Sequence, residues 1–186
     1  NTWFDMSKPW IDYQLRNNFL LQQGRYVADV CYFIGENAPK SNGIQEPPLP
    51  QGYSFDVINY DVIMNQLDVK DGRFTLPDGM SYKVMALPES ETMRPELLLK
   101  ISNLVEKGGI ILGSPPIKSP GLENYPDCDE EVSDLSEKLW DNIDGVTHRY
   151  GAFGKGMVFR NMNMEEVFEN LKLNPDFKTD EEVPVL

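Results

Sequence analysis

The apolar positions between residues 82 and 114 predict one β–α–β unit. An apolar run, Val84–Leu87, is followed by a proline and a polar loop, and a second run, Ile110–Leu112, follows two glycines. Between the runs, residues 94–107 carry apolar side chains at helical spacing, and Gly108 is typical of a helix terminator. A unit of this kind nearly always lies in a parallel sheet that helices cover.

The same patterns predict further elements on both sides of this unit. A near-continuous apolar stretch over residues 26–34 indicates a strand buried on both faces. Two turn signals, Asp71-Gly72 and Asp78-Gly79, predict a hairpin ribbon ahead of a strand over Tyr82–Leu87. We therefore expect an α/β fold with four or more mainly parallel strands, helices on both faces of the sheet and a β-hairpin insertion. The other expected elements are helices over residues 7–23 (with Ser7 as the cap), 60–67, 131–142 and 164–171, and strands over residues 53–58 and 157–159.

Charge and hydropathy narrow the functional classes. The formal charge is −13 and the pI is near 4.4, which argues against nucleic-acid binding because phosphates require a basic face. No apolar run approaches the ~18 residues of a membrane span, and no signal-peptide pattern is present. The chain starts at Asn1 and runs directly into helix-forming sequence, so we expect a piece of a longer polypeptide. We divide it into a leading helix, residues 1–24, and a single α/β domain, residues 25–186.

Three loops that follow predicted strands supply the candidate binding residues. They are Glu36 and Asn37 in the first loop, Glu89 and Ser90 in the second, and Ser114 in the third. In open parallel sheets ligands collect beyond the carboxyl ends of the strands, so these loops should share one rim. Paired carboxylates there could perform acid/base chemistry or hold sugar hydroxyls. Alternatively, they are solvated loop residues or helix N-terminal charges, and Glu91 and Thr92 suit capping of the next helix.

Nucleophilic catalysis is not favoured by the sequence. Cys31 falls in the middle of a predicted strand, whereas a catalytic thiol requires a sharp turn and a histidine base. The turn Gly113-Ser114-Pro115 contains a proline, which lacks the amide that an oxyanion hole would use. His148 is the only histidine. A disulfide between Cys31 and Cys128 remains open, since two cysteines make no framework.

No metal or cofactor site is predicted. The acidic cluster of residues 127–131 lacks the alternation and the central glycine of a calcium loop and fits a charged helix start better. No phosphate-binding glycine loop is present, and Gly151, Gly154 and Gly156 fit turns. The aromatic residues around the first helix favour a hydrophobic seam between modules, with sugar stacking as the alternative. These aromatic residues are Trp3, Phe4, Trp10 and Tyr13.

Several segments resemble one family of glycosidases. They are SKPWIDYQLRNNFLLQQGRYVADVCYFIGENAP, DVINYDVIMNQL, MSYKVMALPESETMRPELLLKISNLVEKGGIIL and FGKGMVF. Together they resemble the glutamine-amidotransferase-like α/β domain that follows the catalytic barrel in bacterial α-L-rhamnosidases of glycoside hydrolase family 106. A similar pattern of strand, Leu-Pro, helix, Gly-Gly and strand occurs in the trimerisation domain of family 42 β-galactosidases.

The resemblance implies a flavodoxin-like, class I glutamine-amidotransferase-like fold that has lost its nucleophile. It also implies a non-catalytic accessory domain of a secreted or periplasmic enzyme, acting on plant polysaccharide in a Bacteroides-like bacterium. Residues 1–24 would then be the junction with an upstream catalytic barrel, which would hold the catalytic carboxylates. The alternatives are an autonomous carbohydrate or small-molecule binding module and, third, an amidotransferase-like hydrolase.

Overall fold

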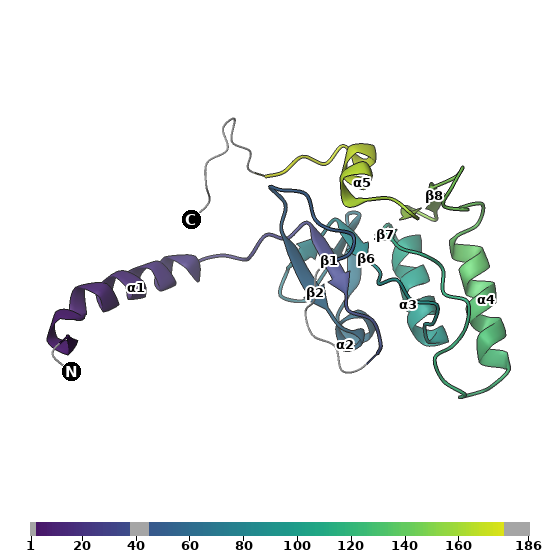
Figure 1. Cartoon of the computed structure of the whole chain (residues 1–186), viewed down its shortest axis with the longest axis horizontal. Helices are drawn as coiled ribbons and strands as arrows, with labels where there is room; N and C mark the ends of the chain where they lie inside the picture. Colours follow the sequence, from purple (N-terminus) through teal and green to yellow (C-terminus); the bar gives the residue numbers. More distant parts are fainter. Residues whose placement is uncertain (1–2, 38–44, 177–186) are drawn as a thin grey trace.

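The computed structural model describes residues 3–37 and 45–176, and its centre is a six-stranded sheet in the order β2-β1-β6-β7-β9-β8 (Figure 1). All neighbouring strands pair in parallel except β8, which is antiparallel to β9. This arrangement confirms the predicted α/β class; the finer likeness to amidotransferases stays a prediction. The strands are β1 (Val30–Phe33), β2 (Phe55–Ile58), β6 (Val84–Ala86), β7 (Ile110–Leu112), β8 (Tyr150–Phe153) and β9 (Gly156–Phe159).

Alternate strand residues point to two different cores. Cys31, Met85 and Ile111 face a core that is shared with α2 (Tyr60–Asn65), α3 (Pro95–Glu106) and α4 (Asp127–Leu139). Their neighbours along the strands face a second core, which is covered by α5 (Met164–Leu171) and by Leu49 and Tyr53 of the loop before β2. Since side chains alternate between the faces of a strand, the continuous apolar runs supply both cores. Helices therefore cover both faces, as expected.

The predicted strand over Tyr82–Leu87 is divided between two sheets. Its first part, β5 (Ser81–Tyr82), pairs with β4 (Arg73–Thr75) in a small antiparallel sheet that also contains β3 (Asp68–Lys70), whereas β6 joins the main sheet. The break is at Lys83, whose ammonium lies 2.9 Å from the buried carboxylate of Asp29. The hairpin prediction is confirmed, because β3 and β4 are joined through Asp71 and Gly72.

The starts of two other elements differ from the predictions by four residues. Helix α4 begins at Asp127, four residues before the predicted start at Glu131, so the acidic cluster forms its first turn. The helix dipole favours negative charge in that turn. Strand β1 begins at Val30, and Tyr26 and Val27, which we predicted to be in the strand, are each 59% exposed. Helix α5 has the predicted bounds, with a capping box at its start.

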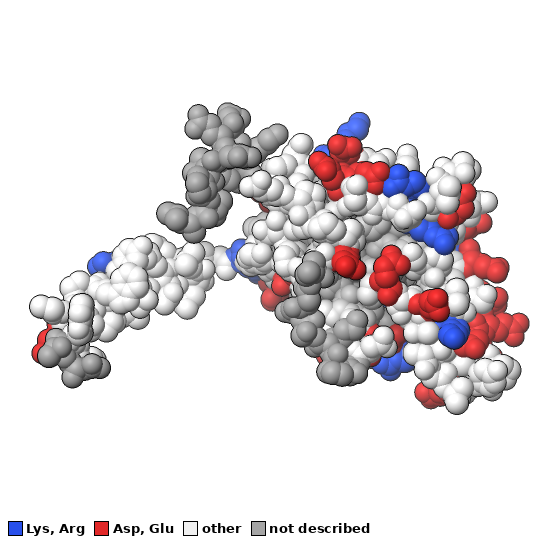
Figure 2. Space-filling view, in the orientation of Figure 1, with Lys and Arg blue, Asp and Glu red and all other residues white. Residues whose placement is uncertain are grey.

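Helix α1 (Lys8–Leu21) has no buried residue and extends away from the sheet and its covering helices (Figure 1). We call residues 3–27 the arm and residues 28–37 and 45–176 the body. Ser7 lies at the start of α1 but makes no capping bond; its hydroxyl donates to the carbonyl of Phe4 instead, so the predicted cap is wrong. Charged side chains are spread over the face of the body that Figure 2 shows, whereas the arm is mostly uncharged.

Candidate functional site

The loops after β1 and β6 meet at the carboxyl edge of the sheet, as predicted. Glu36, Asn37, Glu89 and Ser90 all line one hollow of about 30 Å³. Ser114 is not among the residues that line it. A hollow of this size has room for a water molecule or two and is too small for a sugar ring.

The carboxylate of Glu36 is engaged by the start of α3. It accepts a hydrogen bond of 2.9 Å from the backbone N–H of Arg94 and a second one from Nε of the same residue. The Glu36 side chain is only 9% exposed, and its hydrogen bond raises the pKa of the Arg94 guanidinium. That guanidinium also lies 4.2 Å from the ring centroid of Tyr60. Glu36 therefore anchors the N-terminus of α3 from another loop.

The second loop is held by its own hydrogen bonds. The hydroxyl of Ser90 donates to the Thr92 carbonyl at 2.9 Å and accepts from the Thr92 N–H at 3.2 Å. Neither Glu91 nor Thr92 caps α3. The N-cap residue is Arg94, and its side chain makes no capping hydrogen bond. That part of the sequence prediction is wrong, and Glu36 supplies the acceptor instead. Glu89 remains exposed.

The thiols and the histidine lie in different parts of the body. Cys31 is wholly buried in β1, its thiol donates to the Val84 carbonyl, and burial raises its pKa. Cys128 is buried in α4, and both cysteines are free. His148 is 70% exposed in the turn before β8, where the Asp144 carboxylate accepts from three backbone N–H groups. Within the described ranges no hydrogen bond joins either thiol to His148.

The turn after β7 is held by the end of α4. The indole N–H of Trp140 donates to the carbonyl of Gly113 at 2.9 Å, and the N–H of Gly113 donates to the Phe159 carbonyl. A Cβ at Gly113 would lie 2.7 Å from the Cβ of Leu87, so a side chain does not fit there. The turn is packed against its neighbours rather than open to a substrate.

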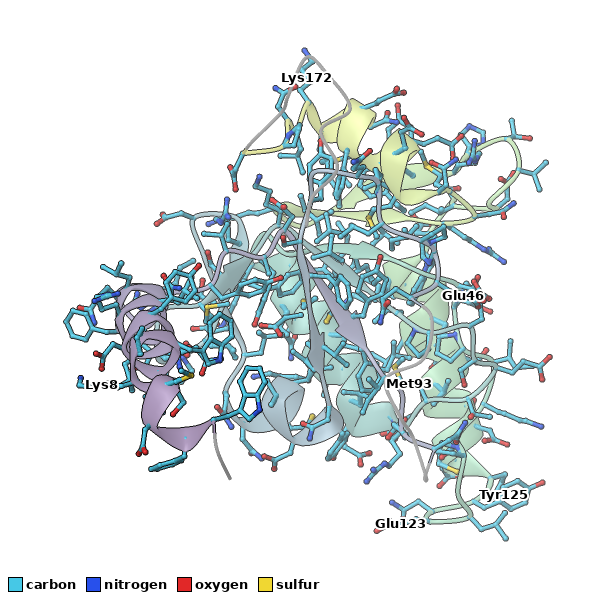
Figure 3. The ribbon with its side chains drawn as sticks, turned by 60° about the vertical axis from the view of Figure 1, so that its left-hand side comes forward. Lys8, Glu46, Met93, Glu123, Tyr125 and Lys172 are labelled. Atoms are coloured by element: carbon cyan, nitrogen blue, oxygen red, sulfur yellow. The ribbon has the colours of Figure 1, made fainter. Side chains whose placement is uncertain are left out.

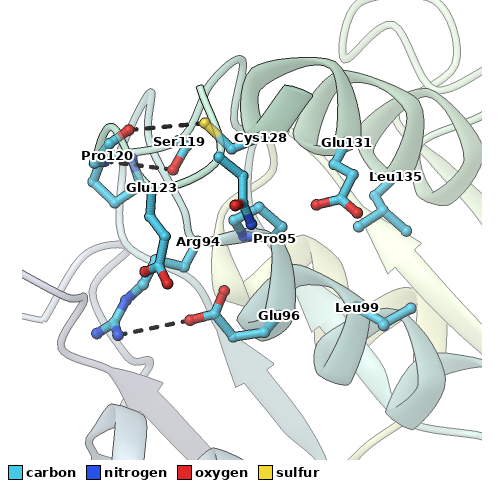
Figure 4. Close-up of a pocket in the computed structure, with 12 residues that line it drawn as sticks. Arg94, Pro95, Glu96, Leu99, Ser119, Pro120, Glu123, Cys128, Glu131 and Leu135 are labelled. Carbon is cyan, nitrogen blue, oxygen red and sulfur yellow. Dashed lines mark hydrogen bonds and ion pairs between the residues drawn. The ribbon is translucent and has the colours of Figure 1, made fainter. Parts of the chain in front are cut away.

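A larger groove, which the sequence did not reveal, lies between the N-terminal parts of α3 and α4 and the loop over residues 119–124 (Figure 4). Its volume is about 540 Å³. Leu99 and Leu135 give it an apolar wall, and three carboxylates line the remainder: Glu96, Glu123 and Glu131. Arg94 contributes the positive charge and lies 3.7 Å from Glu96. The excess of negative charge suits a neutral, hydroxyl-rich ligand better than an anion. The only feature of the sequence that pointed to this groove was the acidic start of α4.

Two findings concern metals and membranes. In the part of the chain that the structure describes, no group of three or more His, Cys, Asp or Glu side chains could hold a metal ion. Among the helices of residues 3–37 and 45–176, none combines the length and the apolar character that a bilayer crossing requires.

Comparison with known proteins agrees with the resemblance noted in the sequence. The model of the glycoside hydrolase family 106 α-L-rhamnosidases matches residues 1–185. A protein of Formosa agariphila named "Putative beta-glucuronidase" is 39% identical over 178 residues, which are 96% of this chain and 14% of that protein. The solved structure of a rhamnosidase from Novosphingobium sp. PP1Y is 30% identical, with a TM-score of 0.81 over 98% of this chain and 17% of the other. The chain thus spans about a sixth or less of the length of these relatives, and it belongs to glycoside hydrolase family 106, the α-L-rhamnosidase family.

Proposed function

We propose that this chain is a non-catalytic accessory domain of a larger glycoside hydrolase of the α-L-rhamnosidase type. One observation carries the proposal: the best-placed carboxylate of the predicted rim, Glu36, is already bound to Arg94, beside a hollow of about 30 Å³. A glycosidase needs two carboxyl groups facing a sugar ring, with one free to give a proton and the other free to act as base or nucleophile. Glu36 is not free in this sense.

The proposed organisation places the chain within a longer polypeptide. Residues 1–24 form the junction with the remainder of the polypeptide, which contains the catalytic barrel, and residues 25–186 form the accessory domain. The parent enzyme acts on plant polysaccharide outside the bacterial cytoplasm. Family membership and the coverage of only 14% and 17% of two relatives support this organisation.

The catalytic test uses the isolated chain with aryl α-L-rhamnoside and aryl β-galactoside. We expect no turnover above the buffer rate, whereas a family rhamnosidase assayed in parallel serves as the positive control. Clear turnover that is lost in Glu36→Gln or Glu89→Gln would contradict the proposal, because it would show a working pair of carboxylates on the rim.

A second candidate function, binding of a carbohydrate, is favoured by the groove between α3 and α4. Its volume of about 540 Å³ lies within the range of ligand pockets, roughly 300–1,000 Å³. The apolar wall at Leu99 and Leu135 could face a sugar ring while Glu96 and Glu131 accept from hydroxyl groups. This module would still be non-catalytic.

Titration calorimetry with rhamnose, galactose and pectic oligosaccharides separates the two roles. A structural domain gives no measurable heat with any of them. A binding module gives measurable heat with at least one of these sugars. In Glu131→Gln the affinity should fall at least about tenfold, which corresponds to about 1.4 kcal/mol of binding free energy. Glu137→Gln is the matched control, because Glu137 is an exposed residue of α4 that does not line the groove.

A further inference from the structure

The arm carries an unusual share of the apolar surface. Twelve of the eighteen exposed large hydrophobic residues of the described chain lie between residues 3 and 27. In α1, Leu15, Phe19 and Leu20 are each at least 60% exposed. An exposed apolar surface of this extent marks a contact site in a soluble protein.

The apolar side chains of α1 extend round most of the helix. Successive residues of an α-helix are about 100° apart. On this basis Tyr13 and Leu20 lie on one flank and Ile11 and Leu15 on the opposite flank, so the apolar arc covers roughly 220° of the circumference. Figure 3 looks almost along α1 and shows side chains on all sides of it. A helix that packs against one surface needs an apolar stripe of only about 100°.

The charged residues of α1 occupy a single stripe. They are Lys8, Asp12 and Arg16, which are four residues apart and span about 80° of the circumference. The ammonium of Lys8 lies 2.7 Å from the Asp12 carboxylate, as expected for neighbours on one helix face. Phe19 lies within the stripe, between Lys8 and Asp12 on the helix surface, and is the one large apolar residue of α1 outside the arc. The polar residues that lie within the apolar arc are uncharged amides: Gln14, Asn17 and Asn18.

From this distribution we infer that α1 inserts between two walls of another part of the same polypeptide, with only the stripe of Lys8, Asp12 and Arg16, which also contains Phe19, in contact with solvent. A single docking surface would leave one apolar flank in water. The inference rests on the proposed function, because it takes the occupant from the remainder of the parent enzyme.

The comparisons supply the argument for this occupant. The match to the Novosphingobium rhamnosidase covers 98% of this chain, so it includes α1, and it leaves 83% of that longer chain to other parts of the molecule. A lipid surface fits less well, because helices that lie on membranes carry a polar face rich in Lys and Arg. The stripe instead contains two basic residues and one acidic residue.

Cysteine labelling in the complete polypeptide tests both walls and the stripe. The variants are Tyr13→Cys and Leu15→Cys on opposite flanks and Asp12→Cys in the stripe. Cys31 and Cys128 of this chain are buried, and the unsubstituted complete polypeptide gives the background labelling. We expect the flank thiols to react with a maleimide at least about tenfold more slowly than the Asp12→Cys thiol, because thiol labelling follows exposure. In the isolated chain all three should react at similar rates, with unchanged thermal stability.

The other outcomes would overturn the inference. Protection of one flank alone means a single docking surface, and equal reactivity of all three positions means an uncovered helix. Protection of Asp12→Cys as well contradicts the solvent-facing stripe. Protection in the isolated chain that rises with its concentration identifies a second copy, and protection on adding phosphatidylglycerol vesicles identifies a membrane. None of these results depends on the hydrolysis assay, so the non-catalytic role and the insertion of α1 can be contradicted separately.

Discussion

Helices α1 and α3 differ in burial although their lengths, 14 and 12 residues, are similar. Helix α3 buries six residues against the sheet and its neighbouring helices, whereas α1 buries none. The apolar residues of α3 form one stripe, and those of α1 spread over most of the circumference. The comparison shows that apolar content predicts a helix, while the distribution of that content predicts how many surfaces the helix needs.

The largest expected difference is between Leu98→Ala in α3 and Leu15→Ala in α1. Leu98 is 0% exposed and Leu15 is 60% exposed. We expect the first change to lower the free energy of unfolding of the isolated chain by about 2–5 kcal/mol, because it leaves a cavity in the core. The second should change it by less than about 0.5 kcal/mol. Urea unfolding measures both, and equal losses would mean that α1 is already packed in the isolated chain.

The next effect concerns how closely α3 approaches the sheet. A Cβ at Gly156 would lie 2.1 Å from the carbonyl oxygen of Gly109 and 2.3 Å from that of Val105 at the end of α3. Gly156→Ala should therefore destabilise the chain by about 1–3 kcal/mol, because α3 must move away from β9. Gly121→Ala is the control, since no atom lies within 4 Å of its Cβ position. If thermal unfolding showed that Gly156→Ala leaves the stability unchanged, this packing would be contradicted.

A smaller effect should separate the two rim glutamates. Glu36→Gln should cost about 1 kcal/mol in unfolding free energy, because it removes the charge that holds the N-terminus of α3 next to a partly exposed arginine. Glu89→Gln should cost less than about 0.5 kcal/mol, because Glu89 is exposed. The same denaturation series measures both. A larger loss for Glu89 would show that the anchor of α3 has been assigned to the wrong carboxylate.

The smallest effect compares two ion pairs of equal length, one in the body and one in the arm. Arg149–Glu166 and Lys8–Asp12 both measure 2.7 Å. The hydrogen bond from Arg149 lowers the pKa of Glu166 below its ordinary 4.5. A lowered folded-state pKa stabilises the fold above pH 4.5, and this contribution disappears as the pH falls through the folded pKa.

Between pH 7 and pH 3, the free energy of unfolding should therefore fall less steeply with decreasing pH in Glu166→Gln than in the parent chain. Asp12→Asn should leave this dependence of the unfolding free energy on pH unchanged, because α1 buries no residue against the body. An equal change of slope in both variants would indicate a general effect of charge and not the Arg149 contact.

Local signals explain which elements could be predicted from the sequence. Asn163 and Glu166 form a capping box, and the predicted bounds of α5 were exact. The Asp71-Gly72 turn, with positive φ at both residues, fixed the hairpin. The division of the strand at Lys83 could not be predicted, because no glycine or proline marks it; the cause is the contact with Asp29, which is distant in the sequence.

The candidate site was predictable in position and less so in chemistry. The rule for parallel sheets placed Glu36 and Glu89 at one edge, where the structure also has them. The partner of Glu36 is Arg94, 58 residues further along the chain, and no local pattern connects them. The groove between α3 and α4 depends on how two helices and a loop pack, which residue spacing alone does not encode.

The three tryptophans are divided between the arm and the body, so intrinsic fluorescence can report on each region. Trp3 and Trp10 are 79% and 61% exposed on the arm, whereas Trp140 is 5% exposed with its indole bonded to Gly113. Emission from the first two should therefore be red-shifted and readily quenched by acrylamide, and emission from Trp140 should be blue-shifted and protected. Engagement of the arm can thus be followed by fluorescence, without any attached dye.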